Sequence, residues 1–531
     1  MENSKLPTPI NTDRLADRLK VCDPIDRIIL LKGFKQGFNI GFKSLPNCSL
    51  KITNLRSAEE NPLIMNSLIQ KEIDLGRIKG PFDHPPFPKF QISPVGLVPK
   101  REANSFRMIT HLSCPDGQSI NDGIPDLFAK VAYASVQDAI ELIIKVGKDA
   151  FLAKTDIKSA FRIIPLAPDQ YHLLCFKWEN NYFYDCCLPM GVRSACQIFE
   201  MFSTSLECML HNEGVEFVVH YLDDFLIINN SYDSCLKDLH CFENLAIELN
   251  LPLAPQKTVL PTQTIQFLGI EIDTTLEIIR LPQDKLIKCR EMINTLLGKS
   301  KCQLRELQCL LGLLNFACMV IIPGRAFLQS LYPLVGGLKK KHHFKRLTKQ
   351  TKADLNMFLT FLKHYNGVSF YRQQQFLSPN VKNLYTDAAK SLGYGAWLDK
   401  SWFSEAWPSE WWLDQNITFL ELVPIVIALT VWGNDLENSV LNVHTDNEAL
   451  YFVINKQYSK EPLVKMWIRK LVLLTLTHNI CMKAFHIAGE NNVRADHLSR
   501  LEVNHFKINH ISANIYPTVT TLLPNSLQLD M

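Results

Sequence analysis

Two adjacent carboxylates, Asp223 and Asp224, stand between two apolar runs, residues 215–220 and 225–228. This pattern predicts a β-hairpin with both acids at its tip. Because adjacent like charges repel, the tip is stable only if cations offset the repulsion, and two divalent metal ions would do so and make the pair catalytic. An exposed Asp-Asp turn is the alternative, since Asp is an ordinary turn residue.

A third acid lies upstream, in the run FLAKTDIKSAF at residues 151–161. The run predicts an apolar strand that ends at Asp156, followed by a turn into a helix. An acid at the carboxyl end of a central strand projects from the edge of the sheet, where α/β sites form. If this strand pairs with the hairpin, three carboxylates meet, which is what two Mg²⁺ ions need.

Four more acids lie near the ends of predicted elements in the last third of the chain. Asp387 ends a strand, Glu421 opens a helix, Asp446 ends another strand and Asp496 begins a last helix. Each acid alone fits a helix cap or a surface position. Their order along strand, helix, strand and helix is the informative part.

Composition limits the class of protein. The 531 residues suggest about three or four domains, and 47% hydrophobic residues suit a globular protein. The net charge is only +3, but a basic block fills residues 339–352. That block could follow a phosphate backbone, form a solvated helix face or act as a nuclear-import signal.

The cysteines and the apolar runs predict where the protein works. The fifteen cysteines show neither a CxxC pair nor a zinc-ligand spacing, and residues 1–20 contain no signal peptide. No apolar run reaches the roughly 20 residues that span a bilayer. We therefore expect reduced thiols, no membrane partner and an intracellular protein in the cytoplasm, the nucleus or both.

The remaining pattern predicts the elements that position these acids. Strands are expected at residues 95–98, 106–110, 383–385, 393–398 and 441–444, and helices at residues 25–34, 135–145, 194–211 and 448–455. Leucines recur at helical spacing between residues 304 and 314, which predicts packing. The last 25 or so residues are expected to form a disordered tail.

Several motifs occur in the order seen in reverse transcriptases. They are TDIKSAF, LPMG at residues 188–191, YLDD at residues 221–224 and FLGIEID at residues 267–273. The chain resembles the polymerase of DIRS-like, tyrosine-recombinase-bearing retrotransposons over residues 60–505. The segments GPF at residues 80–82, PPFP at 85–88, SPVGLVPK at 93–100 and SIND at 119–122 favour that group over retroviruses.

The resemblance assigns roles to further residues. Asp156 and Asp223 would bridge the metal ions, with Asp224 beside them. Phe161 would exclude a 2′-hydroxyl, with a plain core position as the alternative. Further positions would contact the incoming triphosphate or lie near the templating base: Lys100, Arg107, Met190, Gly191 and Lys257. For Lys100 and Arg107 a solvated strand pair is the alternative.

The second acid set resembles that of a ribonuclease H. The block HIAGENNVRAD at residues 486–496 strengthens this likeness. His486 would aid proton transfer, or else simply end a strand. Asn447 would touch the 2′-hydroxyl of RNA.

The resemblance implies a mixed α+β and α/β multidomain fold, a right-hand polymerase followed by a ribonuclease H-like domain. We expect a leader at residues 1–75, fingers and palm at 76–283, thumb and connection at 284–378, the nuclease at 379–505 and a tail at 506–531. No protease signature occurs, and the residues after Arg500 are too few for an integrase or recombinase.

The implied function is RNA-directed DNA polymerase and RNA–DNA hybrid ribonuclease. Its cofactors would be Mg²⁺ or Mn²⁺, two ions in each site. Its partners would be an RNA template, a DNA primer, their hybrid and deoxynucleoside triphosphates. A silent nucleic-acid-binding remnant and a protein with ribonuclease H activity alone are the alternatives. The intact acid set favours an active enzyme, because random decay would remove some of these acids.

Overall fold

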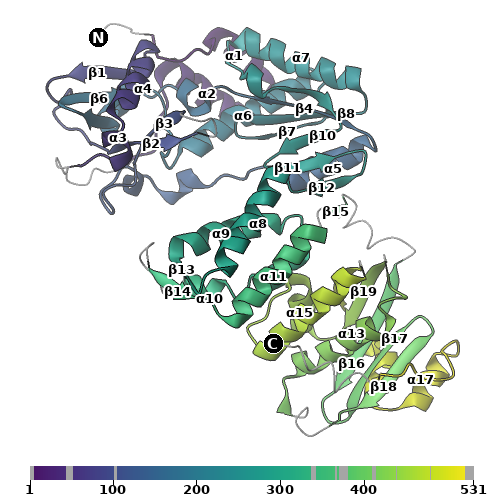
Figure 1. Ribbon diagram of the computed structural model, residues 1–531. Helices are drawn as coiled ribbons and strands as arrows, with labels where there is room; N and C mark the ends of the chain where they lie inside the picture. The colour runs from purple at the N-terminus through teal and green to yellow at the C-terminus, as the bar shows by residue number, and fades with distance from the viewer. Residues whose placement is uncertain are drawn as a thin grey trace. The chain divides into compact units, whose positions relative to one another are not determined.

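The structure is a computed structural model. It describes residues 5–43, 52–100, 105–336, 343–364, 368–369, 381–408, 414–437, 439–478 and 480–520. The chain divides into two compact units, which Figure 1 shows in purple to teal and in green to yellow. The N-terminal unit is Met1–Leu268 with Asp273–Leu276, and the C-terminal unit is Gly269–Ile272 with Glu277–Met531.

The N-terminal unit is built on a four-stranded sheet that carries the first acids. Its strands lie in the order β7 (Val218–Tyr221), β8 (Asp224–Asn229), β4 (Phe151–Asp156) and β9 (Val259–Thr262). β7 and β8 form the predicted hairpin, and β4 pairs with β8 antiparallel. The predicted strand at residues 151–156 is therefore a central strand, flanked on both sides.

Smaller sheets and helices surround that sheet. One sheet runs β1 (Ile78–Phe82), β6 (Asn181–Asp185) and β5 (Cys175–Trp178), and β2 (Val95–Pro99) pairs with β3 (Phe106–Thr110). β10 (Thr264–Phe267) follows the four-stranded sheet in the chain. The helices are α1 (Thr12–Arg18), α2 (Pro24–Gln36), α3 (Arg56–Glu59), α4 (Pro62–Asp74), α5 (Val136–Val146), α6 (Ala195–Asn212) and α7 (Tyr232–Leu249).

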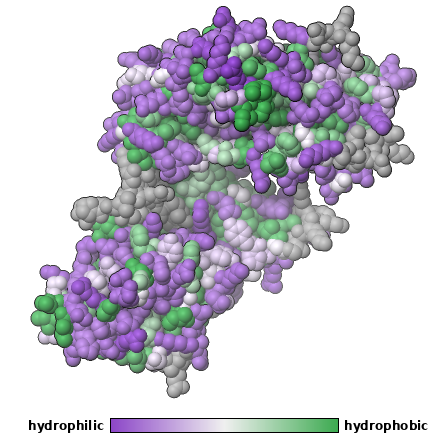
Figure 2. Space-filling view, turned by 180° about the vertical axis from the view of Figure 1, so that it is seen from behind, coloured by the Kyte–Doolittle hydropathy of each residue, from purple (hydrophilic) through white to green (hydrophobic). Residues whose placement is uncertain are grey.

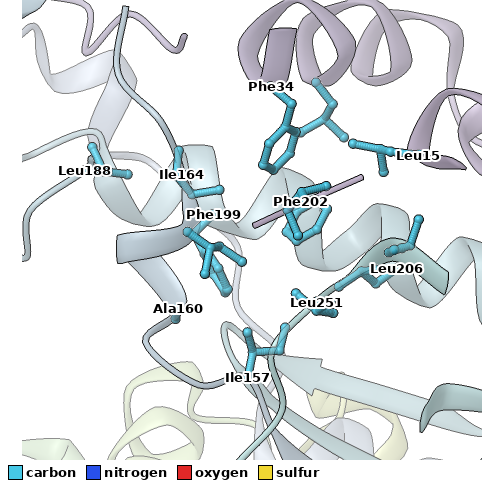
Figure 3. Close-up of a cluster of buried hydrophobic side chains, with 14 of the residues drawn as sticks. Leu15, Phe34, Ile157, Ala160, Ile164, Leu188, Phe199, Phe202, Leu206 and Leu251 are labelled. Carbon is cyan, nitrogen blue, oxygen red and sulfur yellow. The ribbon is translucent and has the colours of Figure 1, made fainter. Parts of the chain in front are cut away.

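One apolar core joins the loop after β4 to the start of the chain. Figure 3 shows Leu15 and Phe34, from α1 and α2, in the same cluster as Phe202 of α6. Ile157, the residue after Asp156, lies in that cluster and is 1% exposed. Burial of Ile157 fixes the backbone at the end of β4, so the core itself positions the carboxylate beside it.

A partly buried arginine joins the loop after β4 to two other elements. Arg162 forms ion pairs with Asp185 at the end of β6, at 2.7 Å, and with Glu72 of α4, at 2.9 Å. It also donates to the carbonyl of Cys187 at 3.1 Å. Asp185 is 2% exposed, so loss of the guanidinium would leave a carboxylate buried without its counter-charge.

We expect Arg162→Ala to lower the unfolding free energy of the N-terminal unit by about 3–5 kcal/mol, the usual effect of removing one partner from a buried pair. The midpoint of denaturant unfolding measures the change. Lys20→Ala is the matched control, because Lys20 pairs with Asp17 in a salt bridge whose side chains are 62% and 64% exposed. Equal shifts for the two variants would contradict the prediction.

The first part of the C-terminal unit is mainly helical. The strands β11 (Ile270–Asp273) and β12 (Ile278–Arg280) lead into them. The elements that follow are α8 (Gln283–Leu297), β13 (Lys301–Gln303), α9 (Leu304–Ala317), α10 (Tyr332–Val335), β14 (Phe344–Arg346), α11 (Lys349–His364) and β15 (Val368–Ser369). The leucines predicted to pack are buried along α9. The basic block at residues 339–352 lies partly outside the described residues; within them, β14 pairs with β13 and α11 starts at Lys349.

A five-stranded sheet follows, with the acids of the second set around it. Its order is β18 (Ser401–Ala406), β17 (Gly393–Leu398), β16 (Lys382–Ala389), β19 (Val440–Thr445) and β20 (Cys481–His486). β18, β17 and β16 are antiparallel, whereas β16, β19 and β20 are parallel. The helices are α13 (Ile417–Trp432), α14 (Glu448–Lys456), α15 (Pro462–Thr477), α16 (Val493–Ser499) and α17 (Val503–Asn509).

The expectation of a disordered tail is wrong for residues 506–520. Phe506 is fully buried against Trp402 and Leu498. The backbone N–H of Thr518 donates to the carbonyl of Trp402 at 2.8 Å, and the Thr520 hydroxyl donates to Glu405 at 3.0 Å. The polar composition of the segment suggested disorder, but the buried Phe506 and these hydrogen bonds hold it against β18. Residues 521–531 lie outside the described part.

Surface and thiols are ordinary for a globular protein. The face shown in Figure 2 is mainly hydrophilic, with apolar residues in small separate patches. In the part of the chain that the structure describes, no helix is both long and apolar enough to cross a bilayer, and the cysteines are free.

Candidate active sites

The register of the central sheet brings the first three acids together. Asp156 pairs directly with Asp224 across β4 and β8, and Asp223 occupies the turn between β7 and β8. The backbone N–H of Ile157 donates to the carbonyl of Asp223 at 2.9 Å, which joins the hairpin tip to the end of β4. The register therefore places the three acids side by side at the same end of the β4–β8 pair, as predicted.

Two lysines offset part of the negative charge. Lys257 donates to both oxygens of Asp156 at 2.8 Å, and Lys154 lies 3.2 Å from Asp224 Oδ2. Burial raises the pKa of Asp223, and the nearby Asp156 raises it further. Burial also raises the pKa of Asp224, although Lys154 opposes that change. The site is thus an acid cluster that gains from added positive charge.

The sequence pattern did not indicate Lys154 as a partner of the acids. It stands two residues before Asp156, so the strand period places both side chains on the same face of β4. Its ammonium also donates to the carbonyl of Gln266 at 3.4 Å. The two-residue spacing from an acid at a strand end is the signal that could have revealed this lysine.

The carboxylates fit a hard divalent cation. Asp224 Oδ1 is buried and has no hydrogen-bond partner among the described residues. A buried carboxylate oxygen without a donor is costly, and a metal ion would satisfy it. Carboxylate oxygens are also the ligands that Mg²⁺ and Mn²⁺ prefer.

The other predicted triphosphate and template residues lie on other elements of the N-terminal unit. Lys100 is exposed just beyond β2, where its backbone N–H bonds to the carbonyl of Ser105 at 2.7 Å. Arg107 of β3 is exposed and contacts Met190 Sδ at 3.2 Å, so the structure brings those two predicted residues together. Gly191 follows with a φ of +99°, a conformation that favours glycine.

Phe161 is only partly buried, and one edge of its ring packs on Phe199 with the centroids 5.4 Å apart. It lies in the short 3₁₀ segment Ala160–Ile163 that follows Asp156. One face therefore contacts the core while part of the ring stays accessible. This placement shows core packing, and contact with a bound sugar stays a prediction.

The second acid cluster lies where the parallel strands β16 and β19 end. Tyr385 pairs with His444, so Asp387 and Asp446, each two residues further on, reach the same level of the sheet. Glu421 comes from α13, and carboxylate oxygens of these three acids lie within 4.8 Å of one another. The prediction that these acids meet is in agreement with this geometry.

The fourth acid of that set, Asp496, lies beside the cluster rather than in it. Its carboxylate accepts a hydrogen bond from Arg500 Nε at 2.7 Å on α16. Burial raises the pKa of Asp387, and Asp446 and Asp496 add to this effect, whereas a hydrogen bond from Ser499 opposes it. Release from Arg500 would free Asp496 as a further ligand.

Asn447, expected to touch the 2′-hydroxyl of RNA, also has a role within the protein. Its side-chain oxygen Oδ1 accepts a hydrogen bond from Leu450 N at 2.9 Å and caps α14, and its side-chain Nδ2 donates to Glu421 Oε1 at 3.3 Å. The hydroxyl of Thr445 donates to the other oxygen of Glu421 at 3.1 Å. Both ends of the Asn447 side chain are therefore engaged inside the protein, where they orient Glu421.

His486 is the last residue of β20, as the alternative reading had it. Its ring is exposed, and Nε2 lies 3.2 Å from the backbone oxygen of Asp446. Asp446 Oδ1 is buried without a hydrogen-bond partner in the described part of the chain, so this cluster also fits a divalent cation. A Cβ added at Gly489 would come within 3.3 Å of Asp446 Oδ2, so glycine keeps that oxygen accessible.

Glu421 makes the stability of the C-terminal unit depend on pH. It is 8% exposed, and burial raises its pKa to about 8, from an ordinary value of 4.5. Between those pH values the folded protein holds a proton that the unfolded chain has released. The free energy of unfolding therefore falls as the pH rises between these two values. The total fall is about 1.4 kcal/mol for each unit by which folding raises the pKa of Glu421.

We expect the metal-free protein to melt at a lower temperature at pH 8 than at pH 6, and Glu421→Gln to lose most of this difference. The Gln side chain keeps the shape but carries no titrating proton. Added Mg²⁺ should raise the melting temperature at pH 8 in the unmodified protein more than in the variant. Scanning calorimetry with and without a chelator measures both effects, and an unchanged pH dependence in the variant would refute the assignment.

Comparison with known proteins agrees with the geometry of the first site. Residues 98–272 match the family model described as reverse transcriptase (RNA-dependent DNA polymerase), so the chain contains a reverse transcriptase domain. This range includes the acids Asp156, Asp223 and Asp224.

Curated relatives are polyproteins of viruses and transposons. The putative enzymatic polyprotein of Cassava vein mosaic virus is 25% identical over 70% of this chain and 56% of the relative. The Pol polyprotein of transposon gypsy from Drosophila melanogaster is 22% identical, over 78% and 38%. The transposon Tf2-3 polyprotein of Schizosaccharomyces pombe is 24% identical, over 77% and 29%. The chain thus spans about a third to a half of the length of these relatives.

Solved structures show the same fold. A foamy viral protease-reverse transcriptase in complex with double-stranded DNA has a TM-score of 0.52 at 15% identity, over 90% of this chain and 81% of the other. The foamy viral enzyme with an RNA/DNA hybrid has a TM-score of 0.51 at 16% identity, over 89% and 62%. The expected fold class, a mixed α/β multidomain polymerase fold, is confirmed.

Proposed function

We propose that this chain is an RNA-directed DNA polymerase that also cleaves the RNA strand of RNA–DNA hybrids. The observation that carries the proposal is the direct pairing of Asp156 with Asp224, beside Asp223, inside a reverse transcriptase domain. The second acid cluster supports the nuclease half of the proposal.

For polymerisation, Asp156 and Asp223 would hold two divalent ions, with Asp224 as a third ligand. Bound ions would supply charge neutralisation at the primer 3′-oxygen and at the leaving pyrophosphate. Without these ions, the Lys257 ammonium is the positive charge that orients Asp156. The Lys257 side chain is 56% exposed, so its ammonium is free to turn to a triphosphate oxygen. In this scheme Lys257 compensates the acid before substrate binds and contacts the nucleotide afterwards.

The other predicted residues select and hold the nucleotide. Lys100 and Arg107 would grip the triphosphate, as a point charge and a planar fork. The accessible edge of Phe161 would exclude a 2′-hydroxyl, and Met190 with Gly191 would lie near the templating base. The contact between Arg107 and Met190 supports a shared location for these two roles.

For hybrid cleavage, Asp387, Glu421 and Asp446 would hold the divalent ions, joined by Asp496 after it leaves Arg500. Thr445 and Asn447 keep both oxygens of Glu421 in a fixed orientation. His486 would carry protons between the site and solvent, which its exposed ring beside Asp446 favours. These roles, together with the domain limits given above, form one proposal for the C-terminal unit.

A finer assignment concerns the type of element. We place the chain with DIRS-like retrotransposons on the segments GPF, PPFP and SPVGLVPK. Its partners would be an RNA template, a DNA primer and deoxynucleoside triphosphates. Genomic neighbours of the coding sequence distinguish this assignment, since a tyrosine recombinase beside it would support the DIRS-like type and an integrase would contradict it.

The enzyme proposal is tested by two assays on the purified chain. One follows extension of a DNA primer on an RNA template, and the other follows cleavage of an RNA–DNA hybrid, each with Mg²⁺ and with Mn²⁺. We expect both activities, each lost on addition of a chelator. Absence of both would leave the silent nucleic-acid-binding remnant, and cleavage without extension would leave a ribonuclease H alone.

A further inference from the structure

A second kind of donor cluster lies outside both acid sites, where α16 meets α17. It contains His497 of α16, Glu502 at the start of α17 and His505 within α17. One ligand atom from each residue lies within 4.8 Å of the others. The cluster is accessible, because the side chains of Glu502 and His505 are 43% and 65% exposed.

Both imidazoles face a single carboxylate oxygen. Nδ1 of His497 lies 2.8 Å from Glu502 Oε2, and Nδ1 of His505 lies 3.4 Å from the same atom. One cation could therefore replace the protons that now bridge the three groups.

The spacing suits a tetrahedral metal ion. With metal–ligand bonds of 2.0–2.2 Å, two ligand atoms of a tetrahedron stand about 3.4 Å apart. The two nitrogen–oxygen distances, 2.8 Å and 3.4 Å, lie at or below this value, and the two nitrogens lie within 4.8 Å of each other. Two imidazole nitrogens and one carboxylate oxygen are also donors that Zn²⁺ prefers, whereas Mg²⁺ takes oxygen ligands.

The backbone under the ligands is held in place. The N–H of Glu502 donates to the carbonyl of His497 at 2.7 Å. Phe506, next to His505, is fully buried against Trp402 and Leu498. The two helices thus present the three ligands from a fixed turn, which lowers the entropy cost of metal binding.

We propose that His497, Glu502 and His505 bind Zn²⁺, with water as the fourth ligand, and that the ion fastens α17 to α16. The site is independent of the proposed enzyme activities. The neighbouring Asp496 does not belong to this group of ligand atoms.

Cobalt(II) provides a direct probe, because its visible absorption distinguishes tetrahedral from octahedral coordination. The full-length protein is titrated with Co²⁺ in excess Mg²⁺, which fills the oxygen-ligand sites. We expect a tetrahedral spectrum that Zn²⁺ abolishes by competition. His505→Ala and Glu502→Gln should each weaken Co²⁺ binding by at least about tenfold, since even changes outside the ligand set cost 10–100-fold.

His240→Ala is the matched control. His240 and Glu243 have the same three-residue spacing on α7, and His240 is similarly exposed at 57%. Among the described residues, His240 and Glu243 do not belong to a group of three metal-ligand side chains. The control should keep the full tetrahedral signal, and loss of that signal in it would contradict the assignment.

A melting experiment separates metal binding from a structural role of the histidine. Zn²⁺ should raise the melting temperature of the unmodified protein and of His240→Ala, but not that of His505→Ala. Without metal, His505→Ala should melt within a degree or so of the unmodified protein, because its side chain is exposed. An octahedral cobalt spectrum, or equal Zn²⁺ stabilisation of all three proteins, would overturn the proposal and leave a hydrogen-bonded surface cluster.

Discussion

Asp223→Asn should abolish primer extension on an RNA template and leave hybrid cleavage unchanged. Asp223 stands at the hairpin tip beside Asp156, where burial and that neighbour raise its pKa. An amide in its place cannot bring the negative charge that holds a divalent ion. We expect the extension rate to fall by at least about a thousandfold, the upper range for loss of a single electrostatic group in an active site.

The same substitution should not harm the fold. It removes one of several like charges from a buried cluster, so the metal-free variant should melt at the same temperature as the unmodified protein or higher. Asp116→Asn, at an exposed position, is the control and should keep full extension. Single-turnover extension and calorimetry give both readings, and an active Asp223→Asn variant would remove Asp223 from the catalytic set.

The meeting of the acids was predictable because it depends on local patterns. Asp156 ends a strand, Asp223 lies in the hairpin turn and Asp224 begins the next strand, one residue later than a tip made of both acids would require. Each of these patterns is readable within ten residues. Alternation fixes which face each side chain takes, and pairing of neighbouring strands then brings the acids together. No long-range packing detail was needed to place them.

The partners of those acids were not predictable in the same way. Lys257 reaches Asp156 across 101 positions of sequence, and the Asn447 side chain donates a hydrogen bond to Glu421. These hydrogen-bond partners depend on which polar groups still lack a partner after the core has packed. A single sequence does not show which groups those are. The segment at residues 506–520 escaped for a similar reason, since its order rests on a single buried phenylalanine and a few hydrogen bonds.

The start of the chain shows the same limit. Its first helices carry few apolar residues in a regular pattern, and the sequence suggested a leader without chemistry. In the structure Leu15 and Phe34 are buried in the core that also holds Ile157 beside Asp156. Whether residues 1–75 form a domain of their own stays a prediction, but their apolar side chains are part of what fixes the first site.

The converse substitution, Asp446→Asn, should abolish hybrid cleavage and leave primer extension unchanged. Asp446 lies at the level of Asp387 in the parallel pair β16 and β19, and its Oδ1 has no hydrogen-bond donor among the described residues. An amide there removes the charge that a metal ion would need. The cleavage rate should fall by about a hundredfold or more.

The control is Asp435→Asn, an exposed position of the same unit that should keep full cleavage. Hybrid cleavage at saturating Mg²⁺ and primer extension are measured on the same preparations of each protein. Loss of both activities in Asp446→Asn would mean that the substitution acts through the fold or through shared binding of nucleic acid. Loss of cleavage alone, together with loss of extension alone in Asp223→Asn, requires two separate active sites, because neither a single shared site nor a general defect in nucleic-acid binding can produce opposite losses.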